Sequence, residues 1–286
     1  MAEVARALEA AVRQRPKDWD AWRVYGDWLA EQGDVRGELV QLEHRLTARG
    51  LTADERRALR ARIAALKREH QGEWLAGWTP PAHAALDWRH GFVVGVQLRW
   101  SADTLRVLDV LVNHPTGRLL TRLNISGAEL GDQEARALAA SGVLRSVTEL
   151  DLTVGSIGAG GVRALTRSGA LGSLTRLDLA GNDVVDDGAR ALAEAESLRS
   201  LAVLRLQDNH IGSPGAQALA ASETLTSLAS LSLYANDIDC DGAFALATAQ
   251  HLRSLARLDL GDNDIGDAGR AALAASKSLR RCRVLV

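Results

Sequence analysis

The chain is poor in the residue types on which many functions depend. Among its 286 residues are two cysteines, one methionine, two tyrosines, two phenylalanines and only three lysines. Cys240 and Cys282 are too few and too far apart for a disulfide framework or a zinc site. No apolar run approaches the roughly 18 residues that cross a bilayer. The start, MAEVARALEAAVRQRP, has acidic residues and no long apolar core, so it does not resemble a secretory signal. We therefore expect a reduced, cytoplasmic protein without a membrane partner.

Excess charge is also missing. The formal net charge is −2 and the sequence pI is about 6.4, so nothing indicates a nucleic-acid partner. The seven histidines form no zinc-binding or triad pattern, and GAGG at 158–161 lacks the lysine and hydroxyl of a phosphate loop. The sequence therefore predicts no enzyme, with no catalytic residues, no cofactor and no metal ligands.

A repeat of 27 residues organises the rest of the chain. Four close copies begin at Leu174, Leu201, Leu228 and Leu255, looser copies begin at Leu120 and Val147, and a cut-off copy begins at Cys282. Residues 93–119 form a degenerate leading unit. Each copy starts with alternating LxxLxL, which is typical of a short strand, and continues with an alanine-rich segment typical of a packed helix.

Helix-start residues lie between the two halves of each copy. One column holds side chains that commonly cap helices in four of six copies, so we expect the N-caps there. Its members are Asp132, Ala159, Asp186, Ser213, Cys240 and Asp267. Since one strand–helix unit cannot bury its own apolar faces, the copies must stack side by side.

The pattern LxxLxLxxN with a helical second half resembles ribonuclease-inhibitor-like leucine-rich repeats. The resemblance implies an α/β solenoid over 93–286, with a curved parallel sheet lined by helices. It also implies an asparagine ladder that satisfies backbone groups of the turns, at Asn182, Asn209, Asn236 and Asn263. Ala128 and Gly155 depart from this column, so we expect looser first turns.

The N-terminal region differs in composition. All seven tryptophans lie at or before residue 100, and residues 1–75 show four amphipathic helical patterns. We expect a helical capping domain over 1–78 and a linker over 79–92. Solenoids need caps, so the tryptophans are interpreted as core and cap, with a ligand cage as the alternative.

One segment of this region resembles the bacterial repeat-companion domain. The match rests on a Tyr-x-Asp-Trp-Leu core at 25–29, the turn Gly33-Asp34, and an Arg-Gly-Glu motif at 36–38. That domain accompanies repeat arrays, which is the role that the resemblance implies here.

The stretch DIDCDG at 237–242 is similar to the opening of an EF-hand calcium loop. However, the last ligand position falls on Thr248 instead of a glutamate, and the flanks are a strand and a repeat helix. The same columns hold other residues in other copies, so we interpret the stretch as a turn and helix start. Weak ion binding at the acidic turns, Asp183, Asp237, Asp262 and Asp264, stays an alternative, as does a reactive Cys240 thiol.

The outward strand positions would form a concave face, where we expect a protein partner to bind. Tyrosine and arginine exposed together are typical of interface hot spots. The predicted partner-binding residues are Arg176, Asp178, Val203, Arg205, Gln207, Ser230, Ser232, Tyr234, Arg257 and Asp259. The alternative interpretation is a solvent-exposed face without a partner, whose charge pairs contribute little to stability.

The sequence therefore predicts a non-catalytic scaffold or adaptor. The alternative is a regulatory or accessory subunit whose N-terminal helices carry the partner or ligand site. The strand from Cys282 onward is a second candidate surface, for self-association by edge pairing, with Arg280, Arg281 and Arg283 as gatekeepers against aggregation.

Overall fold

The computed structural model describes residues 2–75, 77–127 and 130–286. The chain divides into two compact units. We call Met1–Val96 with Arg106–Thr121 the N-terminal unit, and Gln97–Leu105 with Arg122–Val286 the repeat unit. Of the helices that the structure describes, none combines the length and the apolar character needed to cross a membrane.

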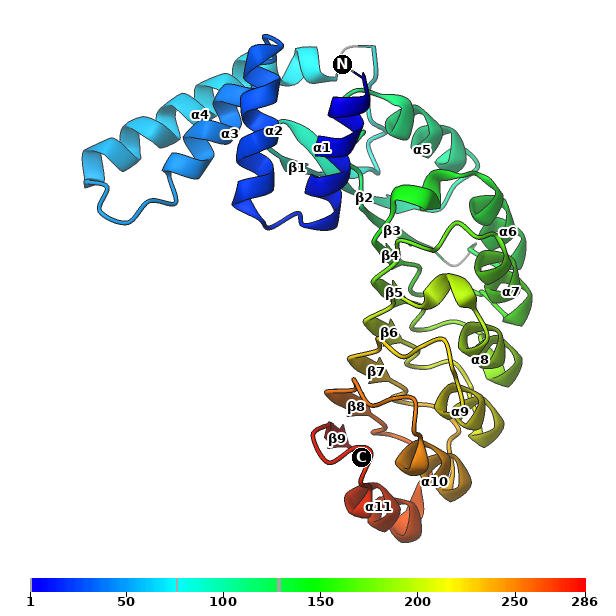
Figure 1. The fold of residues 1–286 in the computed structure, drawn as a ribbon. Helices are drawn as coiled ribbons and strands as arrows, with labels where there is room; N and C mark the ends of the chain where they lie inside the picture. The colour runs from blue at the N-terminus through cyan, green and yellow to red at the C-terminus, as the bar shows by residue number, and fades with distance from the viewer. Residues whose placement is uncertain (1, 76, 128–129) are drawn as a thin grey trace. The chain divides into compact units, whose positions relative to one another are not determined.

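Helices dominate the N-terminal unit (Figure 1). They are α1 (Ala2–Gln14), α2 (Trp19–Glu31), α3 (Arg36–Arg45), α4 (Ala53–Trp74) and α5 (Thr104–Asn113), whose first residues belong to the repeat unit. Strands β1 (Ala85–Arg89) and β2 (Phe92–Arg99) follow α4, so the segment expected as a linker contains a strand. Between them, His90 and Gly91 both take a positive φ, 49° and 79°, which is the signature of a two-residue hairpin turn.

Aromatic side chains form the core of this unit. Trp22, Tyr25 and Phe92 are fully buried in one cluster, which Trp19 and Trp28 flank. A second cluster joins helices α3 and α4 through Leu39 and Ile63, together with Trp74, against which Trp88 packs. Trp22 and Trp74 therefore belong to the core, as the first interpretation of the sequence predicted for the tryptophans.

Each residue of the Arg-Gly-Glu motif at the start of α3 has a structural role. Arg36 is buried, donates to Thr116 Oγ1 at 2.9 Å and lies 4.5 Å from the centre of the Phe92 ring. A Cβ at Gly37 would lie 2.6 Å from backbone atoms of α2, so only glycine allows this helix crossing. Glu38 forms an exposed bidentate ion pair with Arg62 of α4.

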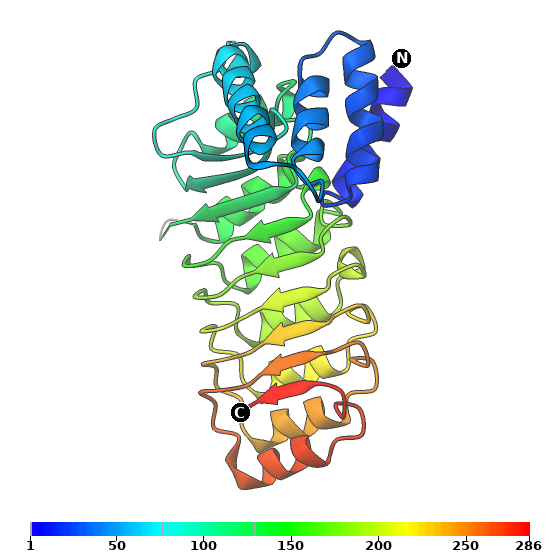
Figure 2. The ribbon, with the colours of Figure 1, turned by 90° about the vertical axis from the view of Figure 1, so that its left-hand side faces the viewer.

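Parallel strands alternate with helices through the repeat unit, and Figure 2 shows the strands stacked in chain order. The register pairs equivalent residues of successive copies, so that Leu150, Leu177 and Leu204 are neighbours in one buried row. The strands are β3 (Arg122–Ser126), β4 (Glu149–Asp151), β5 (Arg176–Asp178), β6 (Val203–Arg205), β7 (Ser230–Ser232), β8 (Arg257–Asp259) and β9 (Arg283–Leu285). The helices are α6 (Asp132–Ala140), α7 (Ala159–Arg167), α8 (Val185–Ala193), α9 (Ser213–Ala220), α10 (Cys240–Thr248) and α11 (Gly266–Ala275).

The asparagine column satisfies the backbone of the turns. Asn236 is representative: its Nδ2 donates to the carbonyls of Leu206, Leu233 and Tyr234 at 2.9–3.1 Å. Its Oδ1 accepts the N–H groups of Ile211 and Asn209. Its own copy and the preceding copy therefore both depend on this one buried side chain.

Residues with positive φ recur immediately before the asparagine column. Val154, Gly181, Asp208, Ala235 and Asp262 take φ between 51° and 67°. The turn that ends in Gly155 therefore keeps a φ like that of the others although it lacks the asparagine, and its expected looseness stays a prediction. Ala128, the other departure from the column, lies outside the described residues.

The predicted N-cap column lies one residue C-terminal to the N-caps that the structure shows for most of the repeat helices. Helices α6, α7, α9 and α10 begin at the column residues themselves, and the N-cap residues precede them, for example Gly158, Gly212 and Asp239. The column side chains cap the helix of the following copy instead. Asp186 Oδ1 accepts the N–H groups of Gly212 and Gly215 at 2.8 and 2.9 Å.

The same device occurs at two other copies. Asp132 accepts from Gly158 and Gly161 of the next copy, and Ser213 Oγ accepts from Asp239 and Gly242. Ordinary caps act within one helix, whereas these link each copy to the next.

Two copies lack a capping side chain in this column because they carry Ala159 and Cys240. The helices that follow them, α8 and α11, start with left-handed residues, Val185 at φ 50° and Gly266 at φ 64°. At the capped copies the equivalent residues, Gly158, Gly212 and Asp239, are extended, with φ near −90°. Loss of the cap and an altered helix entry therefore occur together.

Val185→Gly is expected to stabilise the protein by about 1 kcal/mol, because a β-branched residue is strained at positive φ and glycine is not. The measurement is the urea midpoint followed by far-UV circular dichroism. Val184→Gly, one residue earlier at a buried position with φ −60°, should lower that midpoint. Equal destabilisation by the two changes would contradict strain at Val185.

Candidate functional site

The sheet surface opposite α6–α11 carries the predicted partner-binding residues, and we call it the strand face (Figure 2). Register places eight of the ten in two rows across β5–β8, and Gln207 and Tyr234 follow the ends of β6 and β7. One row holds Arg176, Val203, Ser230 and Arg257, and the other holds Asp178, Arg205, Ser232 and Asp259. The structure therefore brings these residues together, and partner binding by them stays a prediction.

The aspartates of the strand face are structural as well as charged. Asp178 is buried, and its Oδ1 accepts the N–H of Ala180 at 3.2 Å. Asp151 and Asp259 accept from the residue two positions on in the same way. Each aspartate therefore holds the chain where its strand ends, a role that the alternating charges did not reveal.

Arg205 is fixed by one of these aspartates. Its Nη1 lies 3.0 Å from Asp178 Oδ2, while its side chain stays 44% exposed. The ion pair links neighbouring strands β5 and β6. A guanidinium held on one side and open on the other loses less conformational freedom when it binds.

Tyr234 is the exposed aromatic residue of this surface. Its side chain is 45% exposed, and a Cβ at Gly261 would lie 3.1 Å from its ring. The ring therefore rests on the backbone of the next copy, which keeps it in place. The buried Oε1 of Gln207 accepts no hydrogen bond from the residues described. Gly261 was not predicted, because the contact depends on stacking between copies.

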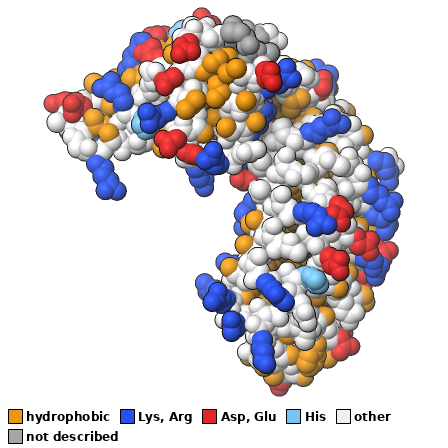
Figure 3. Space-filling model, in the orientation of Figure 1, with side chains coloured by type: hydrophobic (Ala, Val, Ile, Leu, Met, Phe, Trp, Pro, Cys, Tyr) orange, Lys and Arg blue, Asp and Glu red, His pale blue; other side chains and the backbone are white. Residues whose placement is uncertain are grey.

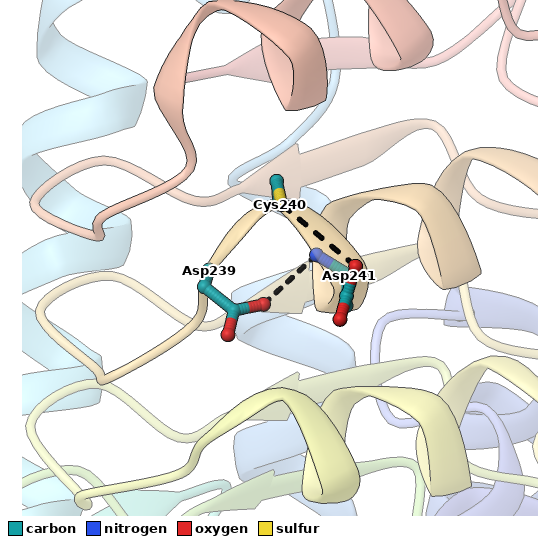
Figure 4. Close-up of side chains that lie close together, drawn as sticks. All are labelled: Asp239, Cys240 and Asp241. Atoms are coloured by element: carbon teal, nitrogen blue, oxygen red, sulfur yellow. Dashed lines mark hydrogen bonds between the residues drawn. The ribbon is translucent and has the colours of Figure 1, made fainter.

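The DIDCDG stretch forms the start of α10 (Figure 4). Asp239 caps its own helix by accepting from the N–H groups of Asp241 and Gly242, and it is hydrogen-bonded to Ser213. The hydrogen bond from Ser213, then those from the backbone, lower the pKa of Asp239. Thr248, at the last ligand position of a calcium loop, donates to a carbonyl of its own helix.

Cys240 lies between the two aspartates, and all three residues offer ligand atoms within 4.8 Å of one another. Desolvation, then the charges of Asp241 and Asp239, raises the pKa of the Cys240 thiol. A raised pKa keeps the thiol protonated, and the thiolate is the form that attacks or binds metals. The cluster is therefore explained as a helix start. Cys282, which stands at the first position of the cut-off copy, is partly exposed.

Comparison with known proteins agrees with this geometry. A family model described as Leucine Rich repeat matches residues 173–193, 197–220 and 251–274. The repeats are leucine-rich repeats. No curated protein matches the chain.

Two solved structures resemble the chain at low identity. An internalin from Listeria monocytogenes is 15% identical, with a TM-score of 0.31, over 66% of this chain and 57% of the internalin. The TLR13–ssRNA13 complex is 17% identical, with a TM-score of 0.37, over 66% of this chain and 32% of that chain. The chain therefore spans less than two thirds of either relative.

Proposed function

We propose that the leucine-rich repeats are a non-catalytic scaffold that binds a protein partner through the strand face. The observation that carries the proposal is that Tyr234 and Arg205, on adjacent copies, are both exposed on the strand face. Both are held by the fold, through Gly261 and Asp178. Tyrosine and arginine are the side chains enriched at hot spots, and pre-ordered side chains lower the entropic cost of binding.

The surroundings of this pair suit an interface. Val203, Ser230 and Ser232 are partly exposed and uncharged, so a partner can cover them without burying an unpaired charge. Charged residues flank them at Arg257 and Asp259, which pair with each other at 3.5 Å. A low-charge centre with a charged rim is the usual anatomy of a protein–protein interface.

Tyr234→Ala is expected to weaken partner binding at least tenfold, by about 2 kcal/mol for a hot-spot tyrosine. The partner is captured from the native host with the full chain, purified, and titrated by calorimetry. Phe244→Ala is the matched control, since Phe244 is 46% exposed on the helix of the same copy. Equal partner affinity of the Tyr234 variant and the original chain would contradict partner binding through the strand face.

A second candidate function places the partner on the N-terminal helices, as a regulatory or accessory subunit would. Val4 of α1 and Val24 of α2 are 51% and 57% exposed, and Figure 3 shows hydrophobic side chains gathered over α1 and α2. Exposed apolar patches often mark interaction sites. Loss of capture in Val24→Ser, with Tyr234→Ala unaffected, would favour this function over the first.

A further inference from the structure

The N-terminal unit has a surface pocket of about 550 Å³ that is open to solvent, and we call it the cavity. Its volume lies within the range of roughly 300–1,000 Å³ found for small-molecule sites. Half of its lining is apolar: Trp19, Leu46, Ile63, Ala64 and Trp88. These side chains come from the start of α2, the end of α3, one face of α4 and the end of β1. The cavity thus lies where four elements of one compact unit converge.

The polar half of the lining is an ordered network around a buried histidine. His90 is 3% exposed, and its Nδ1 is hydrogen-bonded to Glu43 Oε2. Since an ionised carboxylate only accepts, this nitrogen donates, and Nε2 accepts from Arg89 Nε at 3.3 Å. The other oxygen of Glu43 lies 2.6 Å from Lys67 Nζ.

Protonation of this network follows from its surroundings. Burial lowers the pKa of His90, although its hydrogen bond and charge interaction with Glu43 oppose this. Burial alone would raise the pKa of Glu43, but hydrogen bonds from His90 and Lys67 outweigh it and lower the pKa. At neutral pH the network therefore holds a carboxylate, a neutral imidazole and cations.

Positive charge exceeds negative charge in the lining. The lining contains one carboxylate, Glu43, whose two oxygens are engaged by Lys67 and His90, and it also contains Arg60. Arg60 forms no ion pair with any residue that the structure describes. It stands three and four positions before Ile63 and Ala64 on α4, so it shares a helix face with apolar lining residues. A cation thus stands beside apolar walls.

We propose that this cavity binds a small organic anion with an aromatic or other apolar body. The carboxylate or similar acidic group lies at Arg60, and the body packs among Trp19, Trp88 and Ile63. Charge complementarity selects the anion over its neutral analogue, and the apolar walls select it over a bare inorganic anion. This site is independent of the strand face and of any protein partner there.

The test uses the full chain with naphthoate as the probe, its neutral amide and inorganic phosphate as comparisons, and calorimetry as the readout. Naphthoate is expected to bind, and to bind at least about tenfold more tightly than either comparison, since a charge-assisted contact is worth about that factor. Quenching of tryptophan fluorescence should follow the same curve, because Trp19 and Trp88 line the cavity.

Two variants test the location. Arg60→Glu reverses the anchoring charge, and Ala64→Phe fills the cavity from an exposed position. Each should weaken naphthoate binding at least about tenfold. Arg57→Ala is the control, since Arg57 is an exposed α4 arginine, paired with Asp54, outside the lining.

Thermal unfolding of each variant separates lost binding from lost folding. If a variant unfolds at ambient temperature, Arg60→Ala replaces it, because that truncation removes only an exposed side chain. Any of three results would overturn the proposal. They are no binding of naphthoate, equal affinity for the amide or phosphate, and undiminished naphthoate binding by the Arg60 and Ala64 variants.

Discussion

Asn236→Ala should lower the free energy of unfolding of the repeat unit by about 4 kcal/mol. The change leaves the N–H of Ile211 and three carbonyl groups without the side chain that now pairs with them. Each buried group left unsatisfied costs roughly 1–3 kcal/mol, and partial rearrangement reduces the sum. Urea unfolding followed by far-UV circular dichroism gives the difference.

The control for this change is the next residue. Asp237 is exposed, and its only described ion-pair contact is His210 at 3.7 Å, so Asp237→Ala should stay within about 0.5 kcal/mol of the original chain. Similar midpoints for the two variants would mean that the asparagine column does not hold the leucine-rich repeats together.

Gly37→Ala is expected to destabilise the N-terminal unit by about 3 kcal/mol. The added methyl group would meet the Ala30 nitrogen and the Gly26 oxygen at 2.6 Å. Since both are helix backbone atoms, α2 and α3 must move apart, with the loss of packing typical of overfilled cores. Tryptophan fluorescence reports on this unit, because six of the seven tryptophans lie within it.

Gly72→Ala serves as the opposite control. Gly72 is also helical, but a Cβ there meets nothing within 4 Å, so alanine should raise stability by about 0.5 kcal/mol through its better helix propensity. A destabilisation of the same size at both positions would show that helix crossing is not the reason for Gly37.

The order of strands and helices in the repeat unit was predictable, because each strand pattern and each helix pattern recurs with the 27-residue period. The alternation that puts Leu204 on the buried face of β6 recurs 27 residues later at Leu231 of β7, and the two leucines are paired in register. The N-cap column was misplaced because local capping rules assume that donor and acceptor share one helix, whereas Asp186 and Ser213 act on the following copy.

The cavity of the N-terminal unit gave no signal in the sequence. Glu43 and His90 are 47 positions apart, no spacing motif relates them, and the repeat register does not extend to them. Only the packing of α2, α3 and α4 against β1 brings them together. On the strand face, register predicted which residues are neighbours, but the burial of Asp178 depends on its turn.

Capping across copies makes the array directional. Each capped helix start depends on the copy before it. Damage to one copy therefore removes the helix cap of its C-terminal neighbour, whereas it reaches its N-terminal neighbour through the asparagine column. This nearest-neighbour dependence is interrupted after Ala159 and Cys240, where the next helix lacks such a cap. In a one-dimensional array, such weak interfaces separate segments that unfold together. We therefore expect partial unfolding to stop at the boundaries before α8 and α11, and hydrogen exchange should resolve the blocks.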